Sequence, residues 1–215
     1  TPGTDRERLV ETQRSRWQWF ADLAGATRSA WQESGVGCEN GAHAVIIRLR
    51  VRACNAPHQQ QGESVSRSVD YYFSITSPWT YLGHGRFMAL LSKHGATVRV
   101  KPVDYGKIFP VSGGLPLKQR APQRQAYRLV ELARWRDFLG VPLTVEPKFF
   151  PAPADASARA VIAADIVKGP AAAMRLAHAL MQGCWVQDRN VGDPETVSAI
   201  VREQDLDPAA LGEVA

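Results

Sequence analysis

The stretch from Asp70 to Phe87, DYYFSITSPWTYLGHGRF, constrains the fold more than any other part of the chain. Within Tyr71–Ile75, side chains that suit a core alternate with others at a period of two residues, which is typical of a β-strand. Pro78 then suits the first turn of a helix, where the backbone N–H that proline lacks has no partner in any case. Ser77 is therefore expected at a strand-to-helix junction.

The residues on both sides of this junction predict a β-α-β unit. The expected elements are a strand over Val69–Ile75, a helix from Pro78 to about His94, and a strand over Ala96–Val103. Gly95 fits the left-handed position that often ends a helix. Because the helix returns the chain to its starting edge, the two strands are expected to run parallel.

The chain after the second strand is predicted to be helical. Glycine and proline residues make residues 104–121 an expected loop without long regular structure. Further helices are expected over Pro122–Leu139, Ala154–Val167, Pro170–Val186, Pro194–Gln204 and from Pro208 onward. Tyr127 and Trp135 fall at helical spacing in the first of these and are interpreted as core residues. No strand is expected after Val103, so the two-stranded sheet lacks the strands that would complete it.

Residues 1–68 differ in character from the remainder and are interpreted as a poorly ordered extension. The pattern allows a helix over residues 6–31 and a strand over residues 44–51. Asn55–Ser68 is polar and rich in turn-forming residues, as linkers are.

Composition narrows the class of protein. The 215 residues are 45% hydrophobic, yet no apolar run approaches the roughly 18–20 residues of a membrane span, so no membrane partner and a cytoplasmic location are expected. The three cysteines are scattered, which does not predict a disulfide framework. Cys38 and His43, followed by Cys54 and His58, are the candidate zinc ligands of the sequence. Their first spacing is wider than usual, and no metal site is predicted.

The charge distribution favours an anionic partner. The net charge is +5, and residues 107–136 hold seven basic side chains against one acidic side chain, Glu131. A nucleic acid is the least favoured partner, because the aromatic residues of this stretch are spaced for a core instead of an exposed stacking surface. A small anion is the better expectation.

Ser77 has a structural and a chemical interpretation. Serine followed by proline is a common helix start, and Asp193-Pro194 and Asp207-Pro208 repeat the pattern without evident chemistry. A helix that follows a strand of a β-α-β unit also directs free N–H groups at the space beyond the strand, where they would stabilise an anion such as a thiolate. No cysteine lies within residues 77–80, which excludes a dithiol-disulfide cycle there. Ser77 could instead donate a hydrogen bond to the sulfur of a bound thiol.

Four stretches in order resemble one family: VDYYFSITSPWTYLG, GGLPLKQRAPQRQAYRLVELARWRDFLGVPL, PKFFP, and W followed by DRNV. The family comprises the 2-hydroxychromene-2-carboxylate isomerases and the kappa-class glutathione transferases, relatives of the DsbA-type oxidoreductases. The resemblance covers about residues 69–211 and implies an α/β, thioredoxin-like fold with a large helical insertion. Residues 69–104 would form the first part of the thioredoxin-like domain, and residues 105–215 the substrate loop and insertion. The family's C-terminal half is absent, so the chain as given is expected to be incomplete and inactive.

The resemblance also implies a function. It assigns the glutathione sulfur to Ser77, with Pro78 beside it, and an aromatic carboxylate as the substrate of a glutathione-dependent isomerase in aromatic degradation. Lys107, Lys118 and Arg120 are candidate substrate-binding residues, although solvated loop charges explain them as well. The family's loop asparagine is missing here, which leaves the substrate open. A kappa-type transferase and a non-catalytic thioredoxin-like module remain alternatives, and a homodimer is left open.

Overall fold

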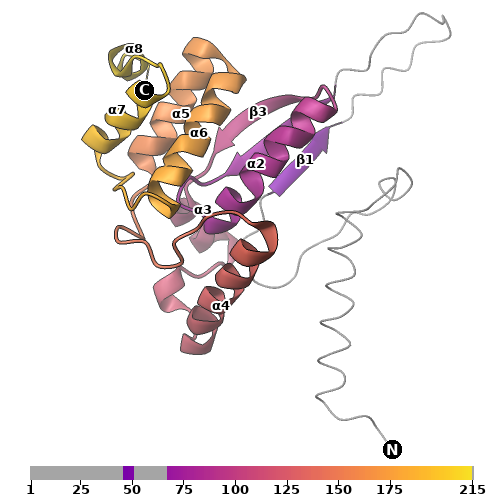
Figure 1. Cartoon of the computed structure of the whole chain (residues 1–215), viewed down its shortest axis with the longest axis vertical. Coiled ribbons are helices and arrows are strands. Elements are labelled where there is room, and N and C mark those ends of the chain that lie inside the picture. The colour runs from indigo at the N-terminus through magenta and orange to yellow at the C-terminus, as the bar shows by residue number, and fades with distance from the viewer. Residues whose placement is uncertain (1–45, 51–66, 215) are drawn as a thin grey trace, which may run out of the picture. The chain divides into compact units, whose positions relative to one another are not determined.

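The computed structural model describes residues 46–50 and 67–214 (Figure 1). The predicted helix over residues 6–31 and the cysteines and histidines of residues 38–58 lie outside the described residues. The elements are β1 (Ile46–Arg50), β2 (Ser68–Phe73), α2 (Pro78–Lys93), β3 (Thr97–Pro102), α3 (Tyr105–Ser112), the 3-10 helix η1 (Leu117–Gln119), α4 (Pro122–Leu139), α5 (Asp155–Lys168), α6 (Pro170–Trp185), α7 (Pro194–Glu203) and α8 (Pro208–Gly212).

Strand β2 lies at the centre of a three-stranded sheet in the order β1-β2-β3. It pairs parallel with β3, with Tyr71 opposite Val100, so the predicted parallel β-α-β unit is confirmed. It also pairs antiparallel with β1, with Tyr71 opposite Ile47. Strand β1 confirms the strand that the pattern allows over residues 44–51, and it adds a third strand to the predicted parallel pair. The domain boundary at residue 68 stays a prediction.

Local capping explains most of the helix ends. Ser77, Asp193 and Asp207 are extended N-cap residues whose side chains accept hydrogen bonds from backbone N–H groups of α2, α7 and α8. Gly95 lies just beyond α2 with φ of 56°, and Gly140 ends α4 with φ of 61°, a conformation that costs glycine little. The predicted starts at Pro78, Pro122, Pro170, Pro194 and Pro208 are confirmed.

Helix α3 corrects the expectation of a loop over residues 104–121. Asp104 caps this helix by accepting a hydrogen bond from the Gly106 N–H at 2.7 Å. Pro110 lies inside it, but the helix has only eight residues, so the missing N–H affects only the last turn. Gly113 then ends the helix in the left-handed conformation. The turn-forming residues therefore limit the length of the helix without preventing it.

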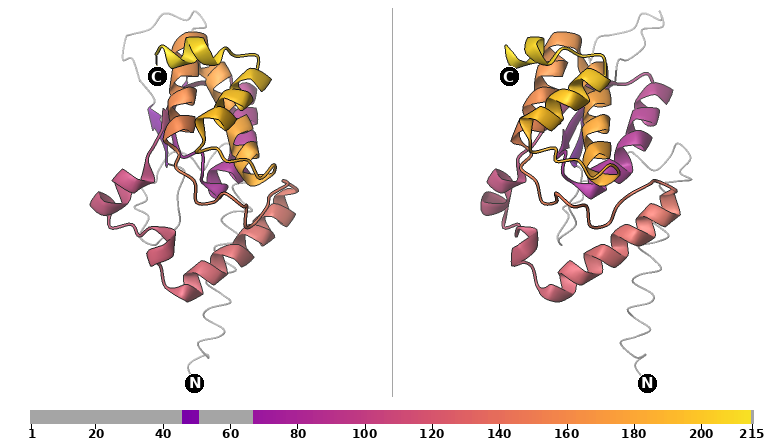
Figure 2. Two further views of the ribbon diagram at one scale, coloured as in Figure 1. Left: turned by 90° about the vertical axis from the view of Figure 1, so that its left-hand side faces the viewer. Right: turned by 60° about the vertical axis from the view of Figure 1, so that its left-hand side comes forward.

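The core lies mainly around α6, which packs against α5 and α2, and both α5 and α6 pack against β3. Buried side chains of α6 include Leu176, Leu180 and Trp185. Figure 2 shows α3, η1 and α4 extending from one end of this packed body. In α4 only Leu132 is buried. The core interpretation is wrong for Tyr127, which is half exposed, whereas Trp135 is partly buried against the core.

Candidate functional site

Ser77 is buried between the end of β2 and the start of α2. Its Oγ accepts a hydrogen bond from the Thr80 N–H at 3.3 Å. Its backbone N–H donates to the Ser74 carbonyl, and its carbonyl accepts from the Tyr81 N–H, both at 3.1 Å. The prediction of a helix cap at the strand-to-helix junction is confirmed. Because Oγ already accepts from the helix, the hydroxyl proton is the group left to serve another acceptor.

Tyr105 is the side chain that meets the Ser77 hydroxyl. Burial raises the pKa of the Tyr105 phenol, and a hydrogen bond with Ser77 opposes this rise. Tyr105 is the first residue of α3, and a hydrogen bond of 2.8 Å from the Val103 N–H to the Phe73 carbonyl fixes the chain just before it. Tyr105 is not among the site residues predicted from the sequence. Its position just after the second strand of the β-α-β unit was the available signal, since parallel strands end at the same edge of a sheet.

Thr80 adds an unsatisfied hydroxyl to the first turn of α2. The residue is fully buried, and its Oγ1 has no hydrogen-bond partner among residues 46–50 and 67–214. The first turn of α2 also contains no acidic residue that would neutralise the positive end of the helix. Buried polar atoms normally have partners, so Thr80 and the free helix end together suit a polar or anionic ligand.

Behind this turn, a buried hydrogen-bond chain joins β2, α2 and α6. His84 Nε2 lies 3.1 Å from the Met174 carbonyl, and His84 Nδ1 lies 3.0 Å from the Tyr71 hydroxyl. A carbonyl only accepts, so Nε2 carries the proton and Nδ1 accepts from Tyr71. The pKa of His84 is lowered to about 4, mainly by burial; the hydrogen bond to the Met174 carbonyl opposes this shift, and His178, whose ring stacks on His84, contributes to it. The neutral imidazole is thus a fixed structural link at neutral pH.

The three predicted substrate-binding residues have different surroundings. The Lys107 side chain is 85% exposed and lies 4.0 Å from the Asp104 carboxylate. Lys118 is exposed on η1. Arg120 is partly buried, and its Nε donates to the Leu115 carbonyl at 2.9 Å. Burial and the nearby Arg124 lower the pKa of Arg120.

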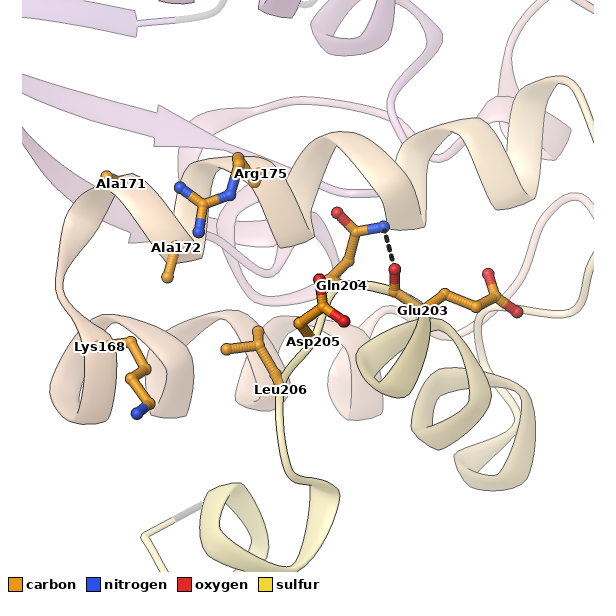
Figure 3. Close-up of a pocket in the computed structure, with 8 residues that line it drawn as sticks. All are labelled: Lys168, Ala171, Ala172, Arg175, Glu203, Gln204, Asp205 and Leu206. Carbon is orange, nitrogen blue, oxygen red and sulfur yellow. Dashed lines mark hydrogen bonds between the residues drawn. The ribbon is translucent and has the colours of Figure 1, made fainter.

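A cavity of about 440 Å³ lies elsewhere, where the turn between α5 and α6 meets the end of α7 (Figure 3). Its lining residues include Lys168, Arg175, Glu203 and Asp205, whose charges offset one another, and the Gln204 amide donates to the Glu203 carbonyl at 3.3 Å. No lining residue comes from β2, α2 or α3. The part of the chain that the structure describes contains no group of acidic, histidine or cysteine side chains suited to a metal ion.

Comparisons with known proteins identify relatives of this chain. The family model described as the DSBA-like thioredoxin domain matches residues 68–215. The 2-hydroxychromene-2-carboxylate isomerase of Pseudomonas putida is 32% identical over 76 residues, which are 35% of this chain and 37% of that protein. Glutathione S-transferase kappa 1 of Caenorhabditis elegans is 32% identical over 82 residues, which are 38% of this chain and 36% of that protein. The matched segment thus spans little more than a third of each relative.

Solved structures support the same fold. A 2-hydroxychromene-2-carboxylate isomerase structure superposes with a TM-score of 0.55 at 23% identity, covering 68% of this chain and 70% of that one. The cytosolic disulfide reductase DsbM from Pseudomonas aeruginosa with GSH gives a TM-score of 0.50 at 14% identity, covering 67% of this chain and 68% of that one. The predicted thioredoxin-like α/β fold is therefore confirmed. Among the described helices, none combines the length and apolar character needed to cross a bilayer.

Proposed function

The chain belongs to the DSBA-like thioredoxin domain family, and from that premise we propose that it is a glutathione-dependent isomerase of the 2-hydroxychromene-2-carboxylate type in aromatic degradation. One observation carries the proposal: the buried Ser77 hydroxyl lies at the start of a helix without acidic residues in its first turn. Such a position stabilises a negative charge through the positive end of the helix dipole. Ser77 would add a charge-assisted hydrogen bond to a thiolate.

Four residues of this turn and its neighbour would hold the cofactor. Ser77 would donate its hydroxyl hydrogen to the glutathione sulfur. The Ser77–Tyr105 hydrogen bond would then reverse, with the Tyr105 hydroxyl as donor and Ser77 Oγ as acceptor. The unpaired Thr80 hydroxyl supplies a further donor. Pro78 at the first helical position lies beside Ser77 without adding an N–H group that needs a partner. When bound, glutathione supplies a thiolate that adds reversibly to a conjugated double bond and is regenerated when the bond re-forms.

The cysteine within residues 67–214, Cys184, does not substitute for glutathione at the site. Cys184 is buried in α6, and burial, with a contribution from Asp188, raises its pKa to about 12. A thiol with such a pKa stays protonated and unreactive at neutral pH. A cytoplasmic location is part of this proposal, supported by the scattered cysteines and by the need to keep glutathione reduced.

A kappa-type glutathione transferase is the second candidate, favoured by the match to the kappa transferase and by a loop that lacks asparagine. A transferase consumes one glutathione for each electrophile, whereas an isomerase leaves the concentration of glutathione unchanged. Measuring free thiol during turnover separates the two reactions. A binding module without catalysis would give neither product.

The test of the proposal is the titration of bound glutathione, followed by the ultraviolet absorbance of its thiolate, in the full chain. Ser77→Gly should raise the pKa of the bound thiol by about one unit for each ~1.36 kcal/mol of hydrogen bonding that is lost. Glycine is chosen because it weakens a helix cap by only a few tenths of a kcal/mol. Tyr105→Phe should give a smaller rise, since it removes only the partner of Ser77.

Asp193→Gly is the matched control, because Asp193 caps α7 before a proline in the same way. It should leave the thiol titration unchanged. Superimposable titrations of the wild type, Ser77→Gly and Asp193→Gly would reduce Ser77 to a helix cap and overturn the proposal. An equal rise of the thiol pKa in Ser77→Gly and Asp193→Gly would show that the titration responds to helix capping as such, and would also overturn the proposal.

A further inference from the structure

Arg128 of α4 is a partly buried cation whose guanidinium contains a buried nitrogen without a partner in the described residues. Its Cζ lies 5.0 Å from the centre of the Phe150 ring, in a cation–π contact. Its Nη2 is buried and has no hydrogen-bond partner within residues 46–50 and 67–214. Buried charged groups normally pair, because an unpaired N–H of a cation in a dry environment is costly. Nη2 can therefore donate a hydrogen bond to an acceptor that the described residues do not provide.

The neighbours of Arg128 add positive charge to the same place. Arg120 lies close enough to lower the pKa of Arg128, although burial is the larger cause and Glu146 opposes both. Arg124 acts on Arg120 in the same sense. Arg120 is held in position by its hydrogen bond to the Leu115 carbonyl, while the Gln125 amide donates to the Arg120 carbonyl at 2.8 Å. Like charges held together in this way suit an anionic ligand.

Aromatic rings lie next to this positive charge. The partly buried Phe150 ring lies 5.0 Å from the buried ring of Trp185. Figure 2 shows the segment after α4, which carries Phe150, running back along that helix. The same segment is joined to α2, since the Tyr81 hydroxyl donates to the Pro142 carbonyl at 2.8 Å. Through Phe150, Arg128 thus contacts the segment whose Pro142 is bonded to the helix turn following Ser77.

We propose that Arg128, with Arg120 beside it, forms a carboxylate-binding site, and that this site takes the carboxylate of the aromatic substrate. The inference deepens the proposed function and rests on it for the identity of the ligand. The planar guanidinium offers two parallel N–H donors that match the two oxygens of a carboxylate. The adjacent rings suit the aromatic part of the same molecule. The exposed Lys107 and Lys118 have no such surroundings.

The test measures binding of salicylate, an aromatic hydroxycarboxylate probe, to the full chain by calorimetry, with its uncharged analogue salicylamide in parallel. Arg128→Met should weaken salicylate binding at least about tenfold, because it removes the charge and both donors but keeps a similar volume. Arg128→Lys should recover only part of the affinity, since a lysine lacks the planar pair of donors. Salicylamide should bind the wild type and Arg128→Met equally weakly.

Arg134→Met is the matched control, because Arg134 lies on α4 but is exposed. It should leave salicylate binding unchanged. The same variants titrated with glutathione identify the source of the carboxylate: a loss confined to glutathione supports the site but assigns it to the cofactor. If Arg128→Met does not fold, Arg120→Met replaces it and should also weaken salicylate binding.

The proposal is overturned if Arg128→Met and Arg134→Met bind both salicylate and glutathione as the wild type does, or if the wild type binds neither. Its failure is distinguishable from failure of the proposed function. The thiolate titration of Ser77→Gly needs no salicylate, and the salicylate arm needs no glutathione. A carboxylate site without a stabilised thiolate would therefore leave this inference standing while the isomerase assignment falls.

Discussion

Helices α6 and α4 are of similar length but differ in the number of residues that they bury. Helix α6 has 16 residues and buries ten of them, whereas α4 has 18 residues and buries only Leu132. Helix α4 exposes Tyr127, Val130 and Phe138 to solvent. The difference distinguishes two parts of the molecule. The body, formed by the sheet with α2 and α5–α8, is tightly packed and contains Ser77. The arm, formed by α3, η1 and α4, has few buried side chains and contains Tyr105 and Arg128. In the proposed function the body fixes the thiol and the arm meets the substrate.

From this comparison we expect a substitution in the body to have the largest effect on the free energy of unfolding. Leu176→Ala should lower the free energy of unfolding by about 2–5 kcal/mol, because Leu176 is fully buried in α6 and its neighbours can close the cavity only in part. Urea unfolding followed by circular dichroism measures the loss. A change below about 1 kcal/mol would mean that α6 is not the rigid centre of the fold.

The second prediction concerns the pH dependence of the body. The pKa of His84 falls from an ordinary value of 6.5 to about 4, so the unfolded chain binds a proton between these values while the native chain does not. Stability contributed by the neutral imidazole is fully present above pH 6.5 and is lost as the pH falls toward 4. The expected loss is on the order of 3 kcal/mol across this window.

Unfolding measured at a series of pH values, with the profile of His84→Gln subtracted from that of the wild type, isolates this contribution. His94→Ala is the control, because His94 is exposed at the end of α2 and should keep the wild-type profile. If wild type and His84→Gln gave parallel profiles, the neutral Tyr71–His84–Met174 chain would not exist in solution.

The smallest effect is expected in the arm. Val130→Ala should change the free energy of unfolding by no more than about 0.5 kcal/mol, because the Val130 side chain on α4 is 47% exposed. The same urea experiment measures it. A loss comparable to that of Leu176→Ala would show that this face of α4 is covered in solution and would remove the contrast between arm and body.

The sequence was sufficient where local chemistry decides the structure. The helix starts at Ser77, Asp193 and Asp207 follow from cap residues and the prolines after them, which act within one turn. The parallel pair followed from strand-helix-strand order. Helix α3 was missed because Pro110 and the glycines around it were interpreted as excluding a helix, although the Asp104 cap was a visible signal.

The candidate site was less predictable because it depends on contacts distant in sequence. Ser77 could be found from its own surroundings, but its contact with Tyr105 requires the folded sheet edge. Arg128 is one of the seven basic residues of 107–136, and its contact with the Phe150 ring could not be predicted because Phe150 belongs to another segment. The spacing of Tyr127 correctly indicated a helix. Helical spacing does not state whether the face it defines is covered, which is why the core interpretation was wrong.

The arm formed by α3, η1 and α4 is an inserted segment whose two ends lie close to the ends of β2 and α2 that flank Ser77. It departs just after Val103, which is bonded to the end of β2, and rejoins at Pro142, which is bonded to Tyr81 on α2. The entropic cost of closing such a loop rises only slowly with its length. The arm can therefore be lengthened, shortened or resurfaced in evolution while the two anchor points, and the serine between them, stay in place. In the proposed function, the residues that contact the substrate can then change without moving the serine that holds the thiol.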